Sequence, residues 1–265
     1  MIWAKLQTAF DNLPHRVDYT CAGRTDVGII RAGNEDNFLM LPEQGVFIVA
    51  DGMGGHAAGE VASEMAVQAV AKSLEGVVGR SDAEAAHMMR LAIHQANASI
   101  FRRTVDEPEK RGMGTTATAL VVNQARYMIG QVGDSRAYLL REGSLTQLTK
   151  DHSYVQEQVD AGYLTPEQAR THPYSNVITR CVGANSDVVP DIYVGTLTPG
   201  DLFLLASDGL TGMLEDHDLH RILTADNTPA QFVDILVNEG NRRGGLDNIT
   251  VIIVRIDGVE EVTGS

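Results

Sequence analysis

Residues 46–55 read V-F-I-V-A-D-G-M-G-G, an unbroken apolar run followed by an acid and a cluster of glycines. Short apolar runs bounded by glycine are typical of buried β-strands. A second run, F-L-L-A-S-D-G at residues 203–209, ends in the same way. Two strands that are apolar along their length and end on a carboxylate indicate a special role for that end of the sheet.

The segments around that first run predict strands and helices in groups. Residues 37–41 and 45–50 are expected to form two strands joined by a hairpin at P-E-Q-G. From Gly59 the apolar residues recur every four positions, which predicts a helix that ends near Gly76. The capping-box spacing S-D-A-E at residues 81–84 predicts the start of a second helix.

The rest of the chain continues this grouping. Cap signals followed by proline, at Thr165 and Thr228, predict two further helices. The second of these helices is expected to face Phe232, Ile235 and Leu236 inward. Because strands and helices come in runs instead of alternating singly, the sequence favours an α+β fold of mostly antiparallel sheets packed face to face, with helices outside. Extended segments are expected at residues 116–122, 125–132, 136–140, 187–195, 201–206 and 249–255.

The composition limits the classes of function. With 265 residues, 43% hydrophobic and 21% charged, the chain suits one large globular domain with a sizeable core. The formal net charge of -14 argues against non-specific binding to nucleic acid or to an anionic membrane. Anionic substrates stay possible, because a bound cation can invert the local charge. No stretch approaches about 18 apolar residues, so no membrane span is expected.

The cysteines and the N-terminus indicate a cytoplasmic location. Cys21 and Cys181 are far apart and form no C-x-x-C pair, which argues against a cysteine zinc site and favours two reduced thiols. The first residues contain no apolar region of the kind that a signal peptide requires.

Three parts of the chain are expected. Residues 1–18 are interpreted as an N-terminal extension, residues 19–257 as the main domain and residues 258–265 as a C-terminal tail. The extension contains Trp3, and it is either a docking element or a frayed end.

Carboxylates recur at the predicted strand boundaries. Ionised carboxylates are costly to desolvate and repel one another, so a cluster of them requires neutralisation. Hard divalent cations such as Mg²⁺ and Mn²⁺ provide it through oxygen ligands. A single Asp-Gly is equally typical of a turn, but the repetition favours a metal site. The acids concerned are Glu35, Asp36, Asp51, Asp134, Asp208 and Asp247.

Seven motifs in chain order resemble those of the PPM/PP2C family of metal-dependent serine/threonine phosphatases, in its compact bacterial form. The resemblance extends from about residue 21 to residue 256. It implies a four-layer αββα sandwich, two central antiparallel sheets flanked by helix pairs, with a flap at about residues 153–176. The motifs are R-A-G-N-E-D (31–36), D-G-M-G-G (51–55), G-T-T-A (114–117), G-D-S-R (133–136), D-H-S (151–153), S-D-G-L (207–210) and G-G-L-D-N-I-T (244–250).

The resemblance implies a site for two Mn²⁺ or Mg²⁺ ions. Asp51 is expected to bridge both ions. Asp208 and Asp247 are expected to hold the first ion. The carbonyl of Gly52, and Glu35 acting through water, are expected to hold the second.

Further residues receive roles from the same resemblance. Asp36 is expected to support the metal ligands from behind, and Arg31 to bind the phosphate with its planar fork. Asp134 together with Asp208 matches the ligands of a third ion in bacterial relatives. A hydroxide shared by the two metals would attack phosphorus, so the cysteines have no part in the reaction.

The sequence departs from the family pattern in two places. Met53 stands where many eukaryotic relatives have a histidine, a candidate general acid, and a thioether cannot donate a proton. His56 is nearby, but a structural place in the following turn is favoured for it, as it is for His152. Gly212 stands where relatives often have an acid that binds the third ion, so a third ion is expected to bind weakly.

The favoured function is hydrolysis of phosphoserine and phosphothreonine in proteins, in opposition to a bacterial serine/threonine kinase. The alternative is a catalytically silent pseudophosphatase that binds a phosphoprotein, although such a protein would normally have lost a metal ligand. A phosphatase of a sigma-factor partner switch would differ only in substrate, and its usual sensor domains are not found in the sequence.

Overall fold

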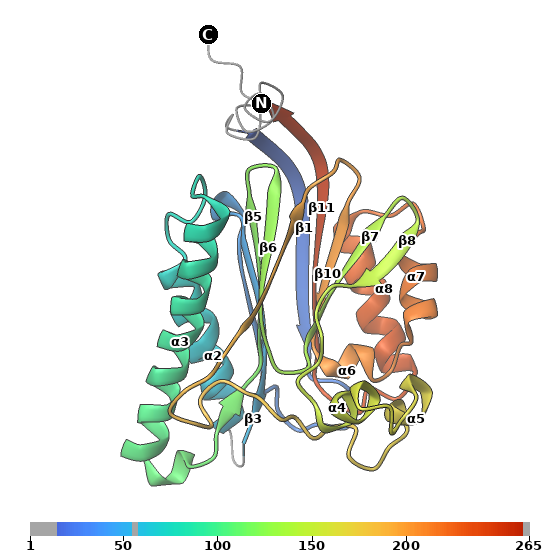
Figure 1. Ribbon diagram of the computed structural model, residues 1–265. Helices are drawn as coiled ribbons and strands as arrows, with labels where there is room; N and C mark the ends of the chain where they lie inside the picture. Colours follow the sequence, from blue (N-terminus) through green and yellow to red (C-terminus); the bar gives the residue numbers. More distant parts are fainter. Residues whose placement is uncertain (1–14, 55–57, 262–265) are drawn as a thin grey trace.

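The computed structural model describes residues 15–54 and 58–261. Two β-sheets lie face to face in the middle of the molecule, with helices on both outer faces (Figure 1). The four-layer αββα sandwich and the α+β class are therefore confirmed. The strands are β1 (His15–Asp26), β2 (Asp36–Leu41), β3 (Val46–Met53), β4 (Gly114–Thr115), β5 (Ala117–Asn123), β6 (Arg126–Val132), β7 (Arg136–Arg141), β8 (Ser144–Gln147), β9 (Asp191–Thr196), β10 (Leu202–Ala206) and β11 (Ile249–Glu261).

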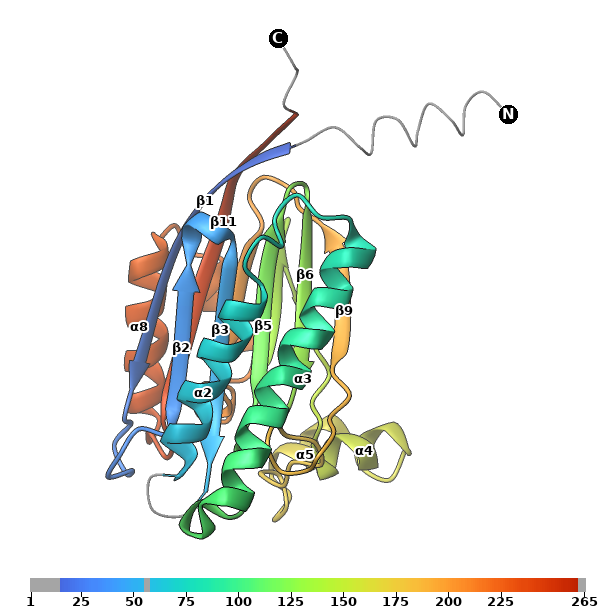
Figure 2. The ribbon, with the colours of Figure 1, turned by 90° about the vertical axis from the view of Figure 1, so that its left-hand side faces the viewer.

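All strand pairs are antiparallel, and each sheet has its own helices. The first sheet has the order β2-β3-β5-β6-β9, with β4 paired to β3, and the second has the order β1-β11-β10-β7-β8. Helices α2 and α3 cover the first sheet, and α7 and α8 lie on the second (Figures 1 and 2). The helices are α2 (Ala58–Ser73), α3 (Asp82–Asp106), α4 (Tyr154–Asp160), α5 (Pro166–Arg170), α6 (Asp208–Thr211), α7 (Asp216–Leu223) and α8 (Pro229–Arg242), with 3₁₀ turns η1 (Pro42–Gln44) and η2 (Pro108–Lys110).

The opening apolar run is unbroken because β3 is buried on both faces. Its Ile48 and Ala50 pack under α2 and α3, whereas Phe47 and Val49 face the second sheet. Successive side chains of a strand point to opposite faces, so only a strand covered on both sides needs apolar residues at every position. The predicted hairpin between β2 and β3 is confirmed.

The helix caps follow the sequence signals. Ser81, Thr165 and Thr228 each form a reciprocal capping box at the start of α3, α5 and α8. The predicted inward direction of Ile235 is wrong, because its side chain is 39% exposed. The buried stripe of α8 runs through Phe232, Val233, Leu236 and Val237, and each residue advances about 100° around a helix axis, which places Ile235 outside the stripe.

The boundaries of the main domain differ from those predicted. β1 begins at His15, and residues 15–18 pair with residues 258–261 of β11. Both strands therefore extend beyond the predicted limits, because residues 15–18 and 258–261 each contain a single apolar residue, Val17 and Val259, too few to show the alternation of a strand by themselves. The remainder of the expected extension, including Trp3, lies outside the described residues.

Three helices were not predicted, namely α4, α7 and the single turn α6. The flap contains α4 as well as the expected α5. α7 completes the second helix pair, and its Leu219, Ile222 and Leu223 are buried at helical spacing. No helix in the described ranges combines the length and the hydropathy that crossing a membrane requires.

Candidate metal centre

Strand register brings the acids of the first sheet together. Asp36 and Asp51 are direct cross-strand partners at the end of the β2–β3 hairpin. The Ser207 hydroxyl, which directly follows β10 in the second sheet, donates to Asp36 Oδ2 at 2.7 Å. This bond joins the two sheets at the end of the sandwich where β3 terminates, at the bottom of Figure 1.

The electrostatics show that the acids are close neighbours. Burial raises the pKa of Asp51 well above its ordinary value, and the charges of Asp36 and Asp208 raise it further. Burial also raises the pKa of Asp208, against a hydrogen bond from Asp51 that lowers it. Burial is thus the main cause of both raised pKa values. Asp134 has its pKa raised well above the ordinary value by burial and then by Asp208.

Asp36 is the most enclosed of these acids at the junction of the sheets. Burial raises its pKa from 3.8 to about 7, although hydrogen bonds from Thr250 and Ser207 act in the opposite direction. Full ionisation of the cluster at neutral pH therefore requires compensating positive charge, because like charges in a buried site oppose one another.

The donor set fits hard divalent cations. Asp208 Oδ1 is buried and has no hydrogen-bond partner among the described residues, and the surrounding donors are oxygens, which Mg²⁺ and Mn²⁺ prefer. Within residues 15–54 and 58–261, no group of three His, Cys, Asp or Glu side chains has the spacing of a metal site.

Gly52 lies where no side chain fits. A Cβ at this position would be 2.1 Å from the Gly59 carbonyl oxygen and 2.4 Å from that of Glu35. The first turn of α2 can therefore pack directly against β3 and Glu35. Burial raises the pKa of the Glu35 carboxyl, whereas Arg31 and the Gly59 N–H favour its charged form.

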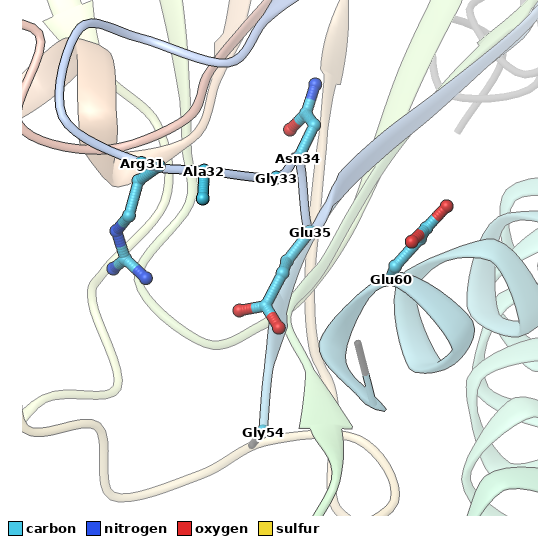
Figure 3. A pocket seen from close by; sticks show the side chains of 7 residues that line it. All are labelled: Arg31, Ala32, Gly33, Asn34, Glu35, Gly54 and Glu60. Carbon is cyan, nitrogen blue, oxygen red and sulfur yellow. The ribbon is translucent and has the colours of Figure 1, made fainter. Parts of the chain in front are cut away.

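Arg31 and Glu35 point toward one another across a pocket of about 280 Å³ (Figure 3). Arg31 Nη2 also lies 2.6 Å from Asp247 Oδ2. Asp247 Oδ1 accepts a hydrogen bond from the backbone N–H of Asn248. The predicted phosphate-binding arginine and a predicted metal ligand are thus ion-paired, and both would take new partners when cations and phosphate bind.

Sequence reasoning missed the residues that hold this loop in place. The Asn248 side chain accepts from the Glu35 N–H and donates to the carbonyls of Val27 and Gly33, all at 2.8–2.9 Å. The motif D-N-I-T contained this signal, but only Asp247 received a role from it. Asn248 therefore fixes the position of the segment that carries Arg31 and Glu35.

Thr115 and Thr116 fix the backbone of Asp51. Thr116 Oγ1 accepts from the Asp51 N–H at 2.9 Å, and the Thr115 hydroxyl donates to the Asp51 carbonyl at 2.9 Å. Both threonines are buried beside β3. Their place in G-T-T-A could have been found from the motif, but the contact depends on the pairing of β3 with β4.

The structure describes three side chains that the sequence analysis excluded from the reaction, His152, Cys21 and Cys181. His152 is buried, and its Nδ1 accepts from the Gly133 N–H, which leaves the proton on Nε2 facing Asp191. Burial lowers the pKa of His152. Cys21 and Cys181 are both free thiols. His56 lies outside the described residues.

Comparisons with known proteins agree with this fold. The family model described as Protein phosphatase 2C matches residues 32–236. The serine/threonine phosphatase Stp of Listeria monocytogenes is 40% identical over 238 residues, covering 88% of this chain and 94% of the relative. The protein phosphatase PhpP of Streptococcus pneumoniae is 39% identical over 236 residues, covering 88% and 96%.

Solved structures give the same result. The Mycobacterium tuberculosis serine/threonine phosphatase PstP/Ppp superposes with a TM-score of 0.85 at 37% identity, covering 91% of this chain and 99% of that one. The catalytic domain of PstP in complex with two manganese ions has a TM-score of 0.83 at 35% identity, covering 92% and 100%.

The fold, the acidic end of the sandwich and these matches define the class of protein, a PPM-type protein serine/threonine phosphatase. The chain belongs to the protein phosphatase 2C family, in its compact bacterial form.

Proposed function

We propose that the chain hydrolyses phosphoserine and phosphothreonine in proteins by direct attack of water on phosphorus, at a site for two Mn²⁺ or Mg²⁺ ions. The observation that carries this proposal is the convergence of acids from both sheets at one end of the sandwich, with Asp208 Oδ1 buried and unpaired. The relative solved with two manganese ions supports it.

The ligands are assigned as the motifs imply. Asp51 would contribute to binding both ions, and Asp208 and Asp247 would hold the first. The Gly52 carbonyl and, through water, Glu35 would hold the second. When bound, such ions neutralise the phosphate and lower the pKa of a water molecule, so that it can attack near neutral pH.

The surrounding residues position these ligands. Asp36 supports them from behind, held by Ser207 and Thr250. The hydrogen bonds of Asn248 keep Glu35 in place at the edge of the site.

Arg31 binds the phosphate in this mechanism. Its side chain is exposed and is held by Asp247 alone among the described carboxylates within ion-pair distance, so it can turn to a phosphate that enters the pocket. The planar guanidinium meets a phosphate with two parallel N–H groups. It therefore stabilises the charge that develops on the phosphoryl oxygens as the new P–O bond forms and the seryl or threonyl P–O bond breaks.

No protein nucleophile is needed. Burial raises the pKa of the Cys181 thiol, which keeps its sulfur protonated and unreactive. Met53 ends β3 and has no proton to give, so the leaving alkoxide takes its proton from another group or from water. The products are the free hydroxyl amino acid and inorganic phosphate.

A weak third ion is a further part of the proposal. Asp134 lies close enough to Asp208 for their charges to interact. Gly212, which follows α6, offers no carboxylate there. Asp134 and Asp208 would therefore share such an ion with water, and its affinity should be lower than that of the first two.

Hydrolysis of a phosphothreonine peptide tests the proposal. Turnover should require Mn²⁺ or Mg²⁺, stop on addition of a chelator, and be lost in Asp208→Ala. Turnover that survives the chelator and the substitution would contradict it. A peptide that is bound but never hydrolysed would favour the silent-binder alternative.

We also propose that the physiological substrates are the targets of a bacterial serine/threonine kinase, or the kinase itself. The bacterial phosphatases among its relatives support this. Phosphoproteomics of a deletion strain should show phosphoserine and phosphothreonine sites that rise, and that fall again when the kinase gene is also deleted.

A further inference from the structure

Three large apolar side chains lie exposed beside the candidate site. Ile29, Ile30 and Leu246 are 64%, 65% and 58% exposed, and we refer to them as the apolar rim. Ile30 directly precedes Arg31, and Leu246 directly precedes Asp247. The rim therefore adjoins both the predicted phosphate-binding residue and a predicted metal ligand.

The two segments of the rim are held together by backbone hydrogen bonds. The N–H groups of Ile29 and Ile30 both donate to the Gly245 carbonyl, at 2.8 and 3.2 Å. Gly28 adopts a φ of +83°, and a Cβ there would lie 2.3 Å from the Asp247 carbonyl oxygen. The chain thus approaches itself closely at this point, and the exposed side chains project from a fixed support.

The apolar surface continues from Leu246 toward the end of α6. A Cβ built on Gly244 would contact both Leu246 and the sulfur of Met213, at 3.7 and 3.8 Å. Met213 is itself partly buried against the core under α7 and α8. Exposed apolar side chains that occur singly need no explanation, but a group beside a functional site marks an interaction surface.

The pocket that includes Arg31 has a different character. It is lined by Glu35 and Glu60 and by small or polar residues, without any large apolar side chain (Figure 3). The chain as a whole carries a net charge of -14. An acidic segment of substrate would therefore be repelled. The rim instead offers apolar contact area to the substrate residues on either side of the phosphorylated residue.

We propose that the apolar rim binds an apolar side chain next to the phosphorylated residue, and so selects phosphoserine and phosphothreonine sites flanked by Leu, Ile, Val, Met or Phe. This rests on the proposed function, because it places the phosphate at Arg31 and the metal ligands. An extended peptide advances about 3.3 Å per residue. One or two residues from the phosphate, its side chains thus reach the residues that adjoin Arg31 and Asp247.

Two phosphothreonine peptides of equal charge test this selection. They differ only in the two residues on each side of the phosphothreonine, Leu and Ile in one and Ser in the other. Wild-type protein with Mn²⁺ should show kcat/KM about fivefold or more higher for the apolar peptide, because partial burial of aliphatic side chains favours its complex. In the double variant Ile30→Ser, Leu246→Ser this ratio should fall to near one.

Val78→Ser is the matched control. Val78 is 49% exposed in the turn between α2 and α3, at the other end of the sandwich, so this variant should keep the full ratio. Each protein's turnover of p-nitrophenyl phosphate normalises its activity, and its melting temperature reports folding.

The outcomes separate this inference from the proposed function. Equal kcat/KM for both peptides in the wild type, or an undiminished ratio in the double variant, would overturn the selection by the rim. Light scattering gives a further test, because a dimer could cover the rim. If the double variant dissociated such a dimer without changing the ratio of the two kcat/KM values, selection by the rim would also be overturned. Failure to hydrolyse either peptide or p-nitrophenyl phosphate would instead overturn the proposed function.

Discussion

Strands β3 and β10 differ in chemistry along their length: the middle of each is apolar and the end is acidic. In the middle, Phe47, Val49, Phe203 and Leu205 fill the space between the sheets with apolar side chains that are fully buried. One or two positions after the unbroken apolar run of each strand stands a carboxylate, Asp51 or Asp208, whose pKa burial and neighbouring acids raise.

This difference shows how the fold can hold an unfavourable cluster. The apolar middle supplies the free energy of folding. It also fixes the strand register, because its side chains are packed on both faces. The acids at the end are held together against their repulsion by that register. The middle therefore determines stability and the end determines chemistry, and substitutions should separate the two.

The largest expected effect is on activity, from Asp51→Asn at the acidic end. Loss of the shared metal ligand should lower kcat/KM for a phosphopeptide by about 10³-fold or more. The melting temperature of the chelator-treated protein should stay the same or rise, because the substitution removes a carboxyl whose charged form is opposed by burial and by its neighbours. Steady-state kinetics and thermal melts measure the two quantities.

Asp187→Asn serves as the control, since Asp187 is exposed and pairs only with His94 among the described residues. It should leave both quantities nearly unchanged. A large loss of stability in chelated Asp51→Asn would mean that the acidic end supports the fold after all.

Phe203→Ala should have the opposite profile. The ring of Phe203 is fully buried and packs edge-on against Tyr127, with 5.0 Å between ring centroids. Its removal should lower the free energy of unfolding by about 3–5 kcal/mol, measured by denaturant melts with Mn²⁺ present. Below the melting temperature, kcat should stay close to that of the wild type. Val194→Ala, on an exposed position of β9, should change stability little.

Arg31→Lys should reduce activity less than loss of a metal ligand does. The ammonium keeps the charge but loses the planar fork, so we expect kcat/KM to fall by about 10²-fold. Because the Arg31–Asp247 ion pair is exposed to solvent, the melting temperature should hardly change. A fall in melting temperature as large as that of Phe203→Ala would show that this ion pair stabilises the fold.

The metal-free protein should become less stable as the pH rises from 5 to 8. The folded pKa of Asp36 is raised from 3.8 to about 7, so the native state holds more protons than the unfolded chain over this window. The contribution of such a proton to the free energy of unfolding is fully present below the pKa of the unfolded state. It is lost as the pH rises through the pKa of the folded state. Melts of chelated protein at several pH values should show the decline, and saturating Mn²⁺ should reverse more of it at pH 8 than at pH 6. A rise of stability over this window would contradict the raised pKa.

The smallest expected effect is that of Ser81→Ala, far from the acidic end. Ser81 caps α3 through a reciprocal bond with Glu84, and its loss should cost about 1 kcal/mol of stability. Denaturant melts measure this cost, and phosphopeptide turnover should not change.

Local signals made much of the fold predictable. The capping boxes at Ser81, Thr165 and Thr228 use residues three apart, and the hairpin of β2 and β3 needs only a turn between two apolar runs. The short polar ribbon that begins at His15 and the inner face of α8 depend on partners far along the chain. For that reason the first domain boundary and the direction of Ile235 were predicted wrongly.

The site divides in the same way. Its acids stand at strand ends and could be found by repetition in the sequence. The bonds of Ser207 to Asp36 and of Asn248 to the loop before β2 join residues more than 170 positions apart. The motif D-N-I-T contains Asn248, but the partners in both sets of bonds follow only from how the two sheets meet.

Calorimetric titration of chelator-treated protein with Mn²⁺ at pH 6, in two buffers of different ionisation enthalpy, tests most directly whether the acids are gathered to bind cations. Two equivalents of Mn²⁺ should bind to the wild type with release of protons, since the ions displace protons that the carboxyls hold because their pKa values are raised. Asp51→Asn should lose this binding. Absence of binding, or equal binding by Asp51→Asn without proton release, would contradict the assignment of a metal centre to this end of the sandwich.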